Sequence, residues 1–207
     1  MTLAPILALA LAAESAPFHS LEGGETLGTG GTVAAFSGGF SLFSAAYAQG
    51  LSEGRDWGLE LDADWLTTEL FAGGLYRQLV WRSGGFFASG RLRAGLYGDL
   101  GASYAASANR ADGGLSVSPG LAGSVHALGG LFSLGADLPL YVTLSRGGGF
   151  AFGLKGSTAF EAPVGKDLAL GARLGILGLW SFGGAPFAED SPRASYEVGL
   201  VLTYQLL

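Results

Sequence analysis

The sequence contains no cysteine and only two histidines in 207 residues. Without cysteine the chain has no disulfide framework and no thiolate ligand for a metal ion. Charged residues are also scarce, at 14% of the chain, against about 25% in ordinary soluble domains. A soluble domain of this size needs a polar surface, so the scarcity of charge indicates that much of this surface does not face water.

Long apolar runs are missing as well, although 49% of the residues are hydrophobic. A membrane-spanning helix needs roughly 20 consecutive apolar residues, and the longest comparable stretch, MTLAPILALALAA at the start, is too short. The other structure that satisfies every backbone group in lipid is a closed β-barrel. The composition therefore favours a membrane barrel. The net charge is −6 and the basic residues are scattered, so the sequence does not predict a basic surface that would bind nucleic acid.

The first residues have the composition of an export signal. The apolar segment Leu3–Leu11 is followed by small residues, and Ala8-Leu9-Ala10 or Ala10-Leu11-Ala12 fits a cleavage site. No basic residue precedes this apolar segment. We predict a signal peptide over residues 1–13, with a buried strand or a short helix as the alternative, and a periplasmic N-terminal segment over residues 14–25.

The stretch WGLELDADW, residues 57–65, shows a pattern that recurs through the chain. Apolar or aromatic residues occupy every odd position, and glycine or a carboxylate occupies every even position. The side chains of a strand alternate between its two faces, whereas a helix would scatter both sets around its surface. The stretch is therefore predicted to be a strand with one apolar face and one charged face.

Turn residues separate about ten strand-like segments in the sequence, and segments of about ten residues suit tilted membrane-spanning strands. The segments are Thr26–Phe36, Phe40–Gln49, Trp57–Trp65, Glu69–Trp81, Phe86–Leu100, Leu115–Leu128, Leu131–Leu144, Phe150–Ala162, Leu168–Trp180 and Arg193–Leu206, with the first turn at Ser37-Gly38-Gly39. They predict an all-β fold, a transmembrane antiparallel up-and-down β-barrel of about ten strands over residues 26–207. A barrel of eight strands, with the first two segments lost or merged, is the alternative.

The charged face is sparse, and its charges balance in sign between strands. Charges in a narrow lumen are tolerable only if they are paired and hydrogen-bonded. We therefore place the charged face inside and the apolar face against lipid. The predicted lumen charge cluster consists of Glu60, Asp62, Asp64, Arg91, Arg93, Lys155, Glu161, Arg173 and Glu197. Within it we expect Asp62 to pair with Arg91 across Ala72 and Gly74 of the strand between them.

All four tryptophans lie at the ends of predicted strands. Indole rings favour the membrane–water interface, and aromatic girdles flank the apolar band of membrane barrels. Trp57 and Trp65 are separated by roughly 26 Å along an extended strand, which suits the height of such a band once the strand is tilted. The predicted aromatic girdle consists of Trp57, Trp65, Trp81, Trp180 and Tyr204.

The last predicted strand has a recognisable spacing of Glu197, Gly199, Leu202 and Tyr204, which is polar-x-Gly-x-x-hydrophobic-x-aromatic. With this spacing the chain resembles the bacterial outer-membrane β-barrel class, the small single-chain barrels of the OmpA, OmpX and OmpW kind. The resemblance implies a multi-pass β-barrel in the outer membrane, surrounded by outer-membrane lipid. It also implies that these four residues form an assembly signal for the barrel-assembly machinery. The chain ends in Leu206-Leu207, so the usual terminal phenylalanine is absent.

The connections between the predicted strands alternate in length. With both termini in the periplasm, the long stretches 101–114 and 181–192 fall on the outer side of a ten-strand barrel. The short connections Gly129-Gly130 and Pro163–Asp167 fall on the inner side. The outer links near Ser37 and Arg146 are also short.

Possible catalytic groups are few. The carboxylate pair Asp62 and Asp64 would need an Asp–His pair at the same rim to form a protease of the outer-membrane aspartyl type. His126 is predicted at the opposite, periplasmic end. Ser124 and His126 share one face but have no evident third group to orient the histidine. The sequence thus predicts no catalytic residue, no metal site and no cofactor.

These observations predict an outer-membrane barrel without enzymatic activity. Its role would be structural or in surface interaction, with a lumen filled by paired charges. A narrow porin-like channel for ions or small solutes, lined by the same residues, is the alternative. Other envelope proteins are possible partners, and no nucleic acid is expected.

Overall fold

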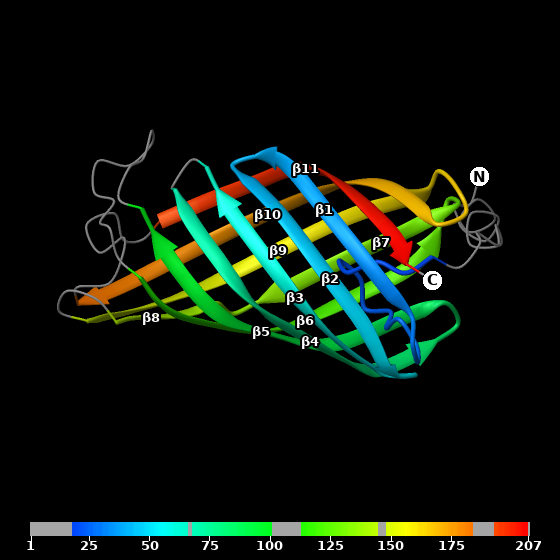
Figure 1. Cartoon of the computed structure of the whole chain (residues 1–207), viewed down its shortest axis with the longest axis horizontal. Coiled ribbons are helices and arrows are strands. Elements are labelled where there is room, and N and C mark those ends of the chain that lie inside the picture. Colours follow the sequence, from blue (N-terminus) through cyan, green and yellow to red (C-terminus); the bar gives the residue numbers. More distant parts are fainter. Residues whose placement is uncertain (1–17, 66–67, 101–112, 145–147, 184–192, 207) are drawn as a thin grey trace, which may run out of the picture.

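The computed structural model describes residues 18–65, 68–100, 113–144, 148–183 and 193–206. The predicted signal peptide over residues 1–13 lies outside the described residues. All regular elements of the described chain are strands (Figure 1). They are β1 (Thr32–Phe40), β2 (Leu42–Ser52), β3 (Arg55–Asp64), β4 (Glu69–Ser83), β5 (Phe86–Asp99), β6 (Gly113–Ala127), β7 (Gly130–Asp137), β8 (Leu140–Thr143), β9 (Gly149–Pro163), β10 (Leu168–Gly183) and β11 (Arg193–Leu206). None of these residues form a helix that is long and apolar enough to cross a membrane.

The strands form one closed antiparallel sheet. Strands β1 to β7 pair in chain order, as do β9 to β11, and β1 pairs with β11 to complete the ring. Strands β7 and β8 occupy the same place in the ring, since both lie between β6 and β9. They are separated at Leu138-Pro139, where proline has no N–H to donate to a ladder. The prediction of a ten-stranded, up-and-down β-barrel is therefore confirmed.

The first hairpin differs from the prediction. The expected turn residues Gly38 and Gly39 lie inside β1, and the chain reverses instead at Ser41, whose φ is 63°. A side chain at Gly39 would overlap the backbone carbonyl of Val198 on β11. The glycine pair therefore permits the close approach of two strands. The expected strand Thr26–Phe36 consequently begins later, at Thr32.

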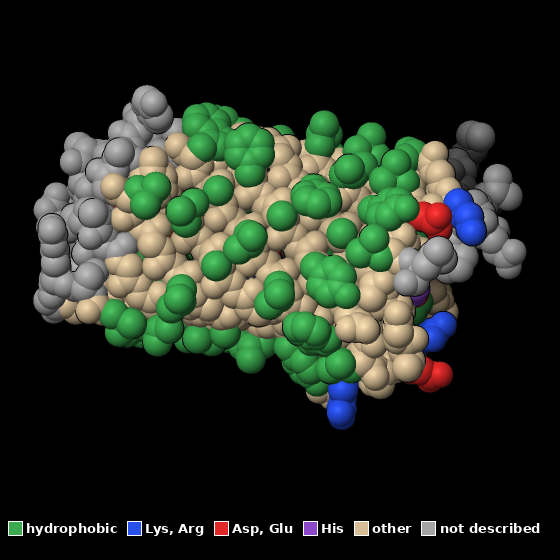
Figure 2. Space-filling model, viewed as in Figure 1, with side chains coloured by type: hydrophobic (Ala, Val, Ile, Leu, Met, Phe, Trp, Pro, Cys, Tyr) green, Lys and Arg blue, Asp and Glu red, His purple; other side chains and the backbone are tan. Residues whose placement is uncertain are grey.

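The faces of the barrel are arranged as the alternation predicts, with apolar side chains outside. Leu59, Leu61 and Leu96 are 57%, 60% and 61% exposed. Arg77 and Glu161, by contrast, are completely buried. Figure 2 shows hydrophobic side chains over the whole visible wall, with charged side chains gathered at one end. The polar interior and apolar exterior invert the arrangement of a soluble barrel.

The two ends of the barrel differ. One end, called here the terminal end, holds the start of β1, the end of β11 and the short connections at residues 53–54, 84–85, 128–129 and 164–167. The opposite end, called the loop end, holds the connections that include residues 101–112 and 184–192. The long connections therefore share one end, as the predicted orientation requires.

Candidate functional site

The terminal half of the lumen contains residues 18–31, called here the inner segment (dark blue in Figure 1). Phe18 is buried against Leu131 and Ala169, at the terminal starts of β7 and β10. The hydroxyl of Thr26 donates a 3.1 Å hydrogen bond to the carbonyl of Glu53, in a turn of the same end. Residues between them reach deeper into the lumen. The inner segment is thus a loop with both of its ends at one opening of the barrel. It includes residues 18–25 of the expected N-terminal segment, and the periplasmic location of residues 14–25 stays a prediction.

Arg77 and Asp56 hold the backbone of the inner segment. Nη1 of Arg77 donates hydrogen bonds of 2.9 and 3.1 Å to the carbonyls of Ser20 and Gly23. Nη2 of Arg77 pairs with Oδ2 of Asp56 at 2.6 Å, and Oδ1 of Asp56 accepts a 2.9 Å hydrogen bond from the amide of Leu27. Both charged side chains are essentially fully buried, and either charge would be strongly destabilising there without the other.

Sequence analysis missed Arg77 and Asp56. The predicted third strand began at Trp57, one residue after Asp56. Extending its alternation backwards would have placed Asp56 on the same face as Glu60. Arg77 lies on the inward face of β4, but the sequence prediction had assigned that face to the even positions Ala72 and Gly74, so Arg77 fell on the face predicted to be outward.

Glu161 and Arg173 of the wall bind two side chains of the inner segment. Glu161, on β9, accepts hydrogen bonds from the hydroxyl of Ser20 and, at 2.5 Å, from that of Thr203. Oε1 of Glu22 accepts a 2.9 Å hydrogen bond from Nη1 of Arg173. Burial alone would raise the pKa of Glu22, but the positive charges of Arg173, Arg91 and Lys155 hold it below its usual value. Glu22 is therefore ionised at neutral pH and carries negative charge into the middle of the lumen.

Arg93 organises the carboxylates of β3. Its Nε and Nη2 atoms donate hydrogen bonds to Glu60 at 2.7 Å and to Asp62 at 2.6 Å. Its guanidinium also lies 4.7 Å from the centre of the Phe71 ring. The side chain crosses β4, the strand that lies between β5 and β3. Two carboxylates thus share one arginine from two strands away.

The expected pairing of Asp62 with Arg91 is wrong. Arg91 forms a two-point ion pair with Asp137 on β7, the second strand from β5 in the direction away from β3. One of its two hydrogen bonds joins Nε of Arg91 to Oδ1 of Asp137 at 2.6 Å. Ala72 and Gly74, expected beneath the arginines, alternate with Gly73 and face outwards. Asp137 was absent from the predicted cluster, although it ends a segment with clear alternation.

Glu197 joins the remaining cations. It pairs with Lys155 at 2.8 Å and with Nη2 of Arg173 at 2.7 Å. Asp64 lies at the loop end of β3, where the hydroxyl of Ser41 donates a 3.4 Å hydrogen bond to it. The nine residues of the predicted lumen charge cluster therefore all face the interior. Among the described residues, each of the five inward-facing cations has a carboxylate partner; these cations are Arg77, Arg91, Arg93, Lys155 and Arg173.

Little open volume is left in the lumen. Two cavities, of about 100 and about 70 Å³, lie between the charged layers. Near the loop end, Leu179 and Ala151 are buried with Tyr141 packed against them. The ring of Tyr141 meets that of Tyr97 edge-on at 5.3 Å. A cavity of 70–100 Å³ holds only a few water molecules.

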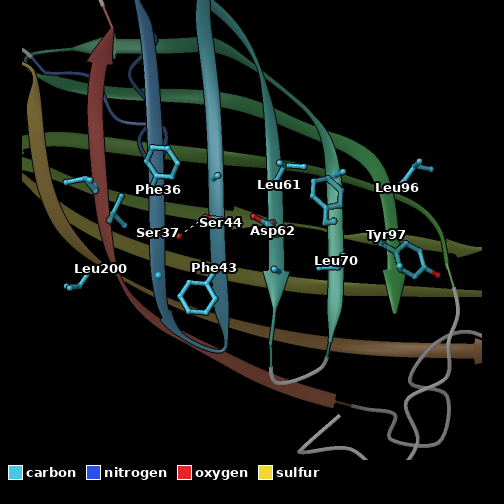
Figure 3. A pocket seen from close by; sticks show the side chains of 18 of the residues that line it. Phe36, Ser37, Phe43, Ser44, Leu61, Asp62, Leu70, Leu96, Tyr97 and Leu200 are labelled. Carbon is cyan, nitrogen blue, oxygen red and sulfur yellow. Dashed lines mark hydrogen bonds between the residues drawn. The ribbon is translucent and has the colours of Figure 1, made fainter. Parts of the chain in front are cut away.

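The wall itself has an apolar hollow of about 940 Å³ that spans β1 to β5, β10 and β11 (Figure 3). Phe36, Phe43 and Leu61 project on its outer side. Ser37 and Ser44 lie behind them, joined by a 2.6 Å hydrogen bond between their hydroxyls. The hollow therefore belongs to the apolar outer wall and holds no reactive constellation.

The predicted girdle residues all project outwards. Trp57, Trp81 and Tyr204 lie near the terminal end, and Trp65 and Trp180 near the loop end, with exposed fractions of 38% to 55%. In the predicted assembly signal, Glu197 and Gly199 face the lumen, whereas Leu202 and Tyr204 face outwards. Recognition of this signal by assembly machinery stays a prediction.

Ser124 and His126 do not form a nucleophile and base. The hydroxyl of Ser124 accepts a 3.1 Å hydrogen bond from the amide of Gly24. Nε2 of His126 lies 3.0 Å from Glu25, and its Nδ1 is buried without a hydrogen-bond partner in the described chain. Both side chains are covered by the inner segment. In the same described ranges, no group of three or more metal-ligating side chains is placed to hold a metal ion.

Comparisons with known proteins identify no family. No family model and no curated protein matches the chain. Among solved structures, outer membrane phospholipase A from Escherichia coli is similar over 96% of each chain, with 9% sequence identity and a TM-score of 0.33. A likeness at that TM-score carries no information about the activity of this chain. The chain is a closed ten-stranded barrel with a polar interior.

Proposed function

We propose that the protein is an outer-membrane β-barrel with a sealed lumen and a non-enzymatic role, either structural or in surface interaction. The observation that carries the proposal is the inversion of the two faces of the barrel. The leucines and aromatic residues that would form the core of a soluble barrel are exposed on the outer wall. Hydrocarbon is the solvent that suits such a wall.

The distribution of aromatic residues and connections supports the membrane setting. Tryptophans lie near both ends of the wall, as expected for side chains at the two interfaces of a bilayer. The short connections share one end with the termini, and the long ones share the other. This is the asymmetry of outer-membrane barrels, whose periplasmic turns are short. The terminal end would therefore face the periplasm.

The filled lumen supports a sealed barrel. Ion pairs join β3 to β5, β5 to β7, and β11 to both β9 and β10 through Glu197. Because such pairs are buried with little solvent, breaking one leaves an uncompensated charge, and this favours a rigid, closed interior. The inner segment fills the terminal half of the same space.

A narrow channel is the second candidate. Nine inward-facing carboxylates line the described wall against five cations, an excess that would suit the passage of cations. They are Asp56, Glu60, Asp62, Asp64, Glu69, Asp99, Asp137, Glu161 and Glu197.

Two measurements test the proposal on the purified full chain. The protein should require detergent or lipid and should show heat-modifiable migration on a gel, because the folded barrel is compact. In a planar lipid bilayer it should give no steady current steps. Steady single-channel steps with a preference for cations would instead establish the channel, and free solubility without detergent would overturn the membrane barrel itself.

A further inference from the structure

We propose that the terminal half of the lumen is a peptide-binding site, and that the inner segment is a separable ligand of it that can withdraw through the terminal opening. The site takes an acidic, glycine-containing peptide that is bent into a loop. This proposal goes beyond the sealed role proposed above, because it concerns exchange of the segment and does not depend on conductance.

The path of the inner segment permits withdrawal. Phe18 and Thr26 both contact residues at the terminal end, and Glu22 between them lies deepest. A loop with both ends at one opening can leave without threading through the barrel. The segment adds no strand to the sheet, since the ring of β1 to β11 closes without it.

The wall offers a built site for a peptide backbone. Arg77, fully buried, donates to two backbone carbonyls of the segment, and Asp56 accepts from a backbone amide. The hydroxyl of Ser124 accepts from another amide, that of Gly24. Side chains that bind main-chain groups in this way hold the backbone of a peptide, whichever side chains the peptide carries at those positions.

Shape and charge supply the selectivity. A Cβ on Gly24 would lie 2.6 Å from the carbonyl oxygens of Ala122 and Phe87, so only glycine fits there. Glu22 carries the negative charge that meets Arg173. A peptide with a residue larger than glycine in place of Gly24, or with a positive charge in place of Glu22, should therefore not bind.

The packing beneath the segment is polar and incomplete. The hydroxyls of Ser133 and Ser89 are buried in this region without a hydrogen-bond partner in the described ranges. Gly23 lies directly over Ser133, since a Cβ on Gly23 would be 3.0 Å from the Ser133 hydroxyl. Polar groups left unpaired by the bound segment would be hydrated once it withdraws, which lowers the penalty of opening.

The chain contains no cysteine, so a single introduced cysteine reports access to the site. Ser133→Cys places the reporter beneath the inner segment, and Ser116→Cys places a control in the loop half of the lumen, where it is also buried. A water-soluble maleimide is applied to the folded full chain in detergent. Heat-modifiable migration verifies that each variant forms the barrel.

Two changes in the inner segment loosen it by different means. Glu22→Lys reverses the charge that faces Arg173, and Gly24→Val introduces the clash with the wall. Each should raise the labelling rate at Ser133→Cys by about tenfold or more, with no change at Ser116→Cys. Arg55→Met, at an exposed position of β3 outside the inner segment, should leave the rate unchanged. A free peptide of sequence FHSLEGGETLGTGG should restore protection to the loosened variants, and the same peptide with Glu22→Lys should not.

Three results would overturn the proposal. They are unchanged labelling at Ser133→Cys, an equal rise at Ser116→Cys, and loss of barrel formation in the loosened variants. The last would show that the segment is part of the wall's own stability. Current steps from the unmodified full chain would contradict the sealed role but would leave the labelling result as it stands.

Discussion

The ion pair between Arg77 and Asp56 should be the most sensitive contact in the lumen. Replacing Arg77 with methionine keeps most of its volume but removes the positive charge. Oδ2 of Asp56 then loses its 2.6 Å partner, and the carbonyls of Ser20 and Gly23 lose their donor. We expect Arg77→Met to lower the free energy of unfolding by about 3–5 kcal/mol, the range found when one partner of a buried pair is removed.

The magnitude follows from burial. The side chains of Arg77 and Asp56 are 0% and 1% exposed, so solvent does not screen the charge left behind. The orphaned Asp56 carboxylate dominates the loss, because an unpaired buried charge is penalised far more than a neutral polar group. The double variant Arg77→Met with Asp56→Asn should therefore be more stable than Arg77→Met alone.

Urea unfolding of the purified barrel in lipid vesicles, followed by heat-modifiable migration, gives the free energies. The control is Arg55→Met, since Arg55 is exposed at the terminal end of β3. It should change stability by about 0.5 kcal/mol or less. A loss below about 1 kcal/mol for Arg77→Met, or no recovery in the double variant, would refute the account of a dry, tightly paired lumen.

Three further outcomes are expected. In a double-mutant cycle measured by urea unfolding, Asp62→Asn and Arg93→Met should show a coupling of about 0.5–3 kcal/mol, because the two side chains share a 2.6 Å ion pair; additive losses would contradict that contact. Gly39→Ala should destabilise the barrel by about 1–3 kcal/mol through overlap with β11, whereas Gly90→Ala, with open space around it, should be neutral in the same assay. The pKa of Glu22 is lowered in the folded state, so its contribution is fully present above its usual pKa of about 4.3 and is lost as pH falls through the lower folded value; the midpoint of urea unfolding should fall in that acidic window, and Glu22→Gln should remove that part of the dependence.

The faces of the strands could be predicted from sequence, but the partners within the lumen could not. Alternation places Arg93 and Glu60 on the inner face because side chains of a strand have a strict period of two. It does not say how far a long side chain reaches along the barrel. In the lateral register Asp62 lies opposite Phe71, which lies opposite Tyr97, yet its charge partner is four residues from Tyr97 along β5.

Glycine was the other source of error. Gly38-Gly39 has the composition of a turn, and only the position of β11 shows that it serves close packing instead. The inner segment gave no periodic signal at all, because its contacts are made through backbone groups and single side chains. Its acidic and glycine residues have meaning only beside Arg77 and Arg173, which are 50 or more positions away in the sequence.

The seam between β1 and β11 has a consequence for how the molecule is made. Thr32 lies opposite Leu206, so the first strand finds its second neighbour only when the last strand has been synthesised. Until then the free edge of Thr32–Phe40 presents unpaired amides and carbonyls, which are open to pairing with other chains. The unpaired edge of β1 must therefore be protected from other chains until the last strand has been made. A chain that stops before Arg193 would keep that unpaired edge permanently.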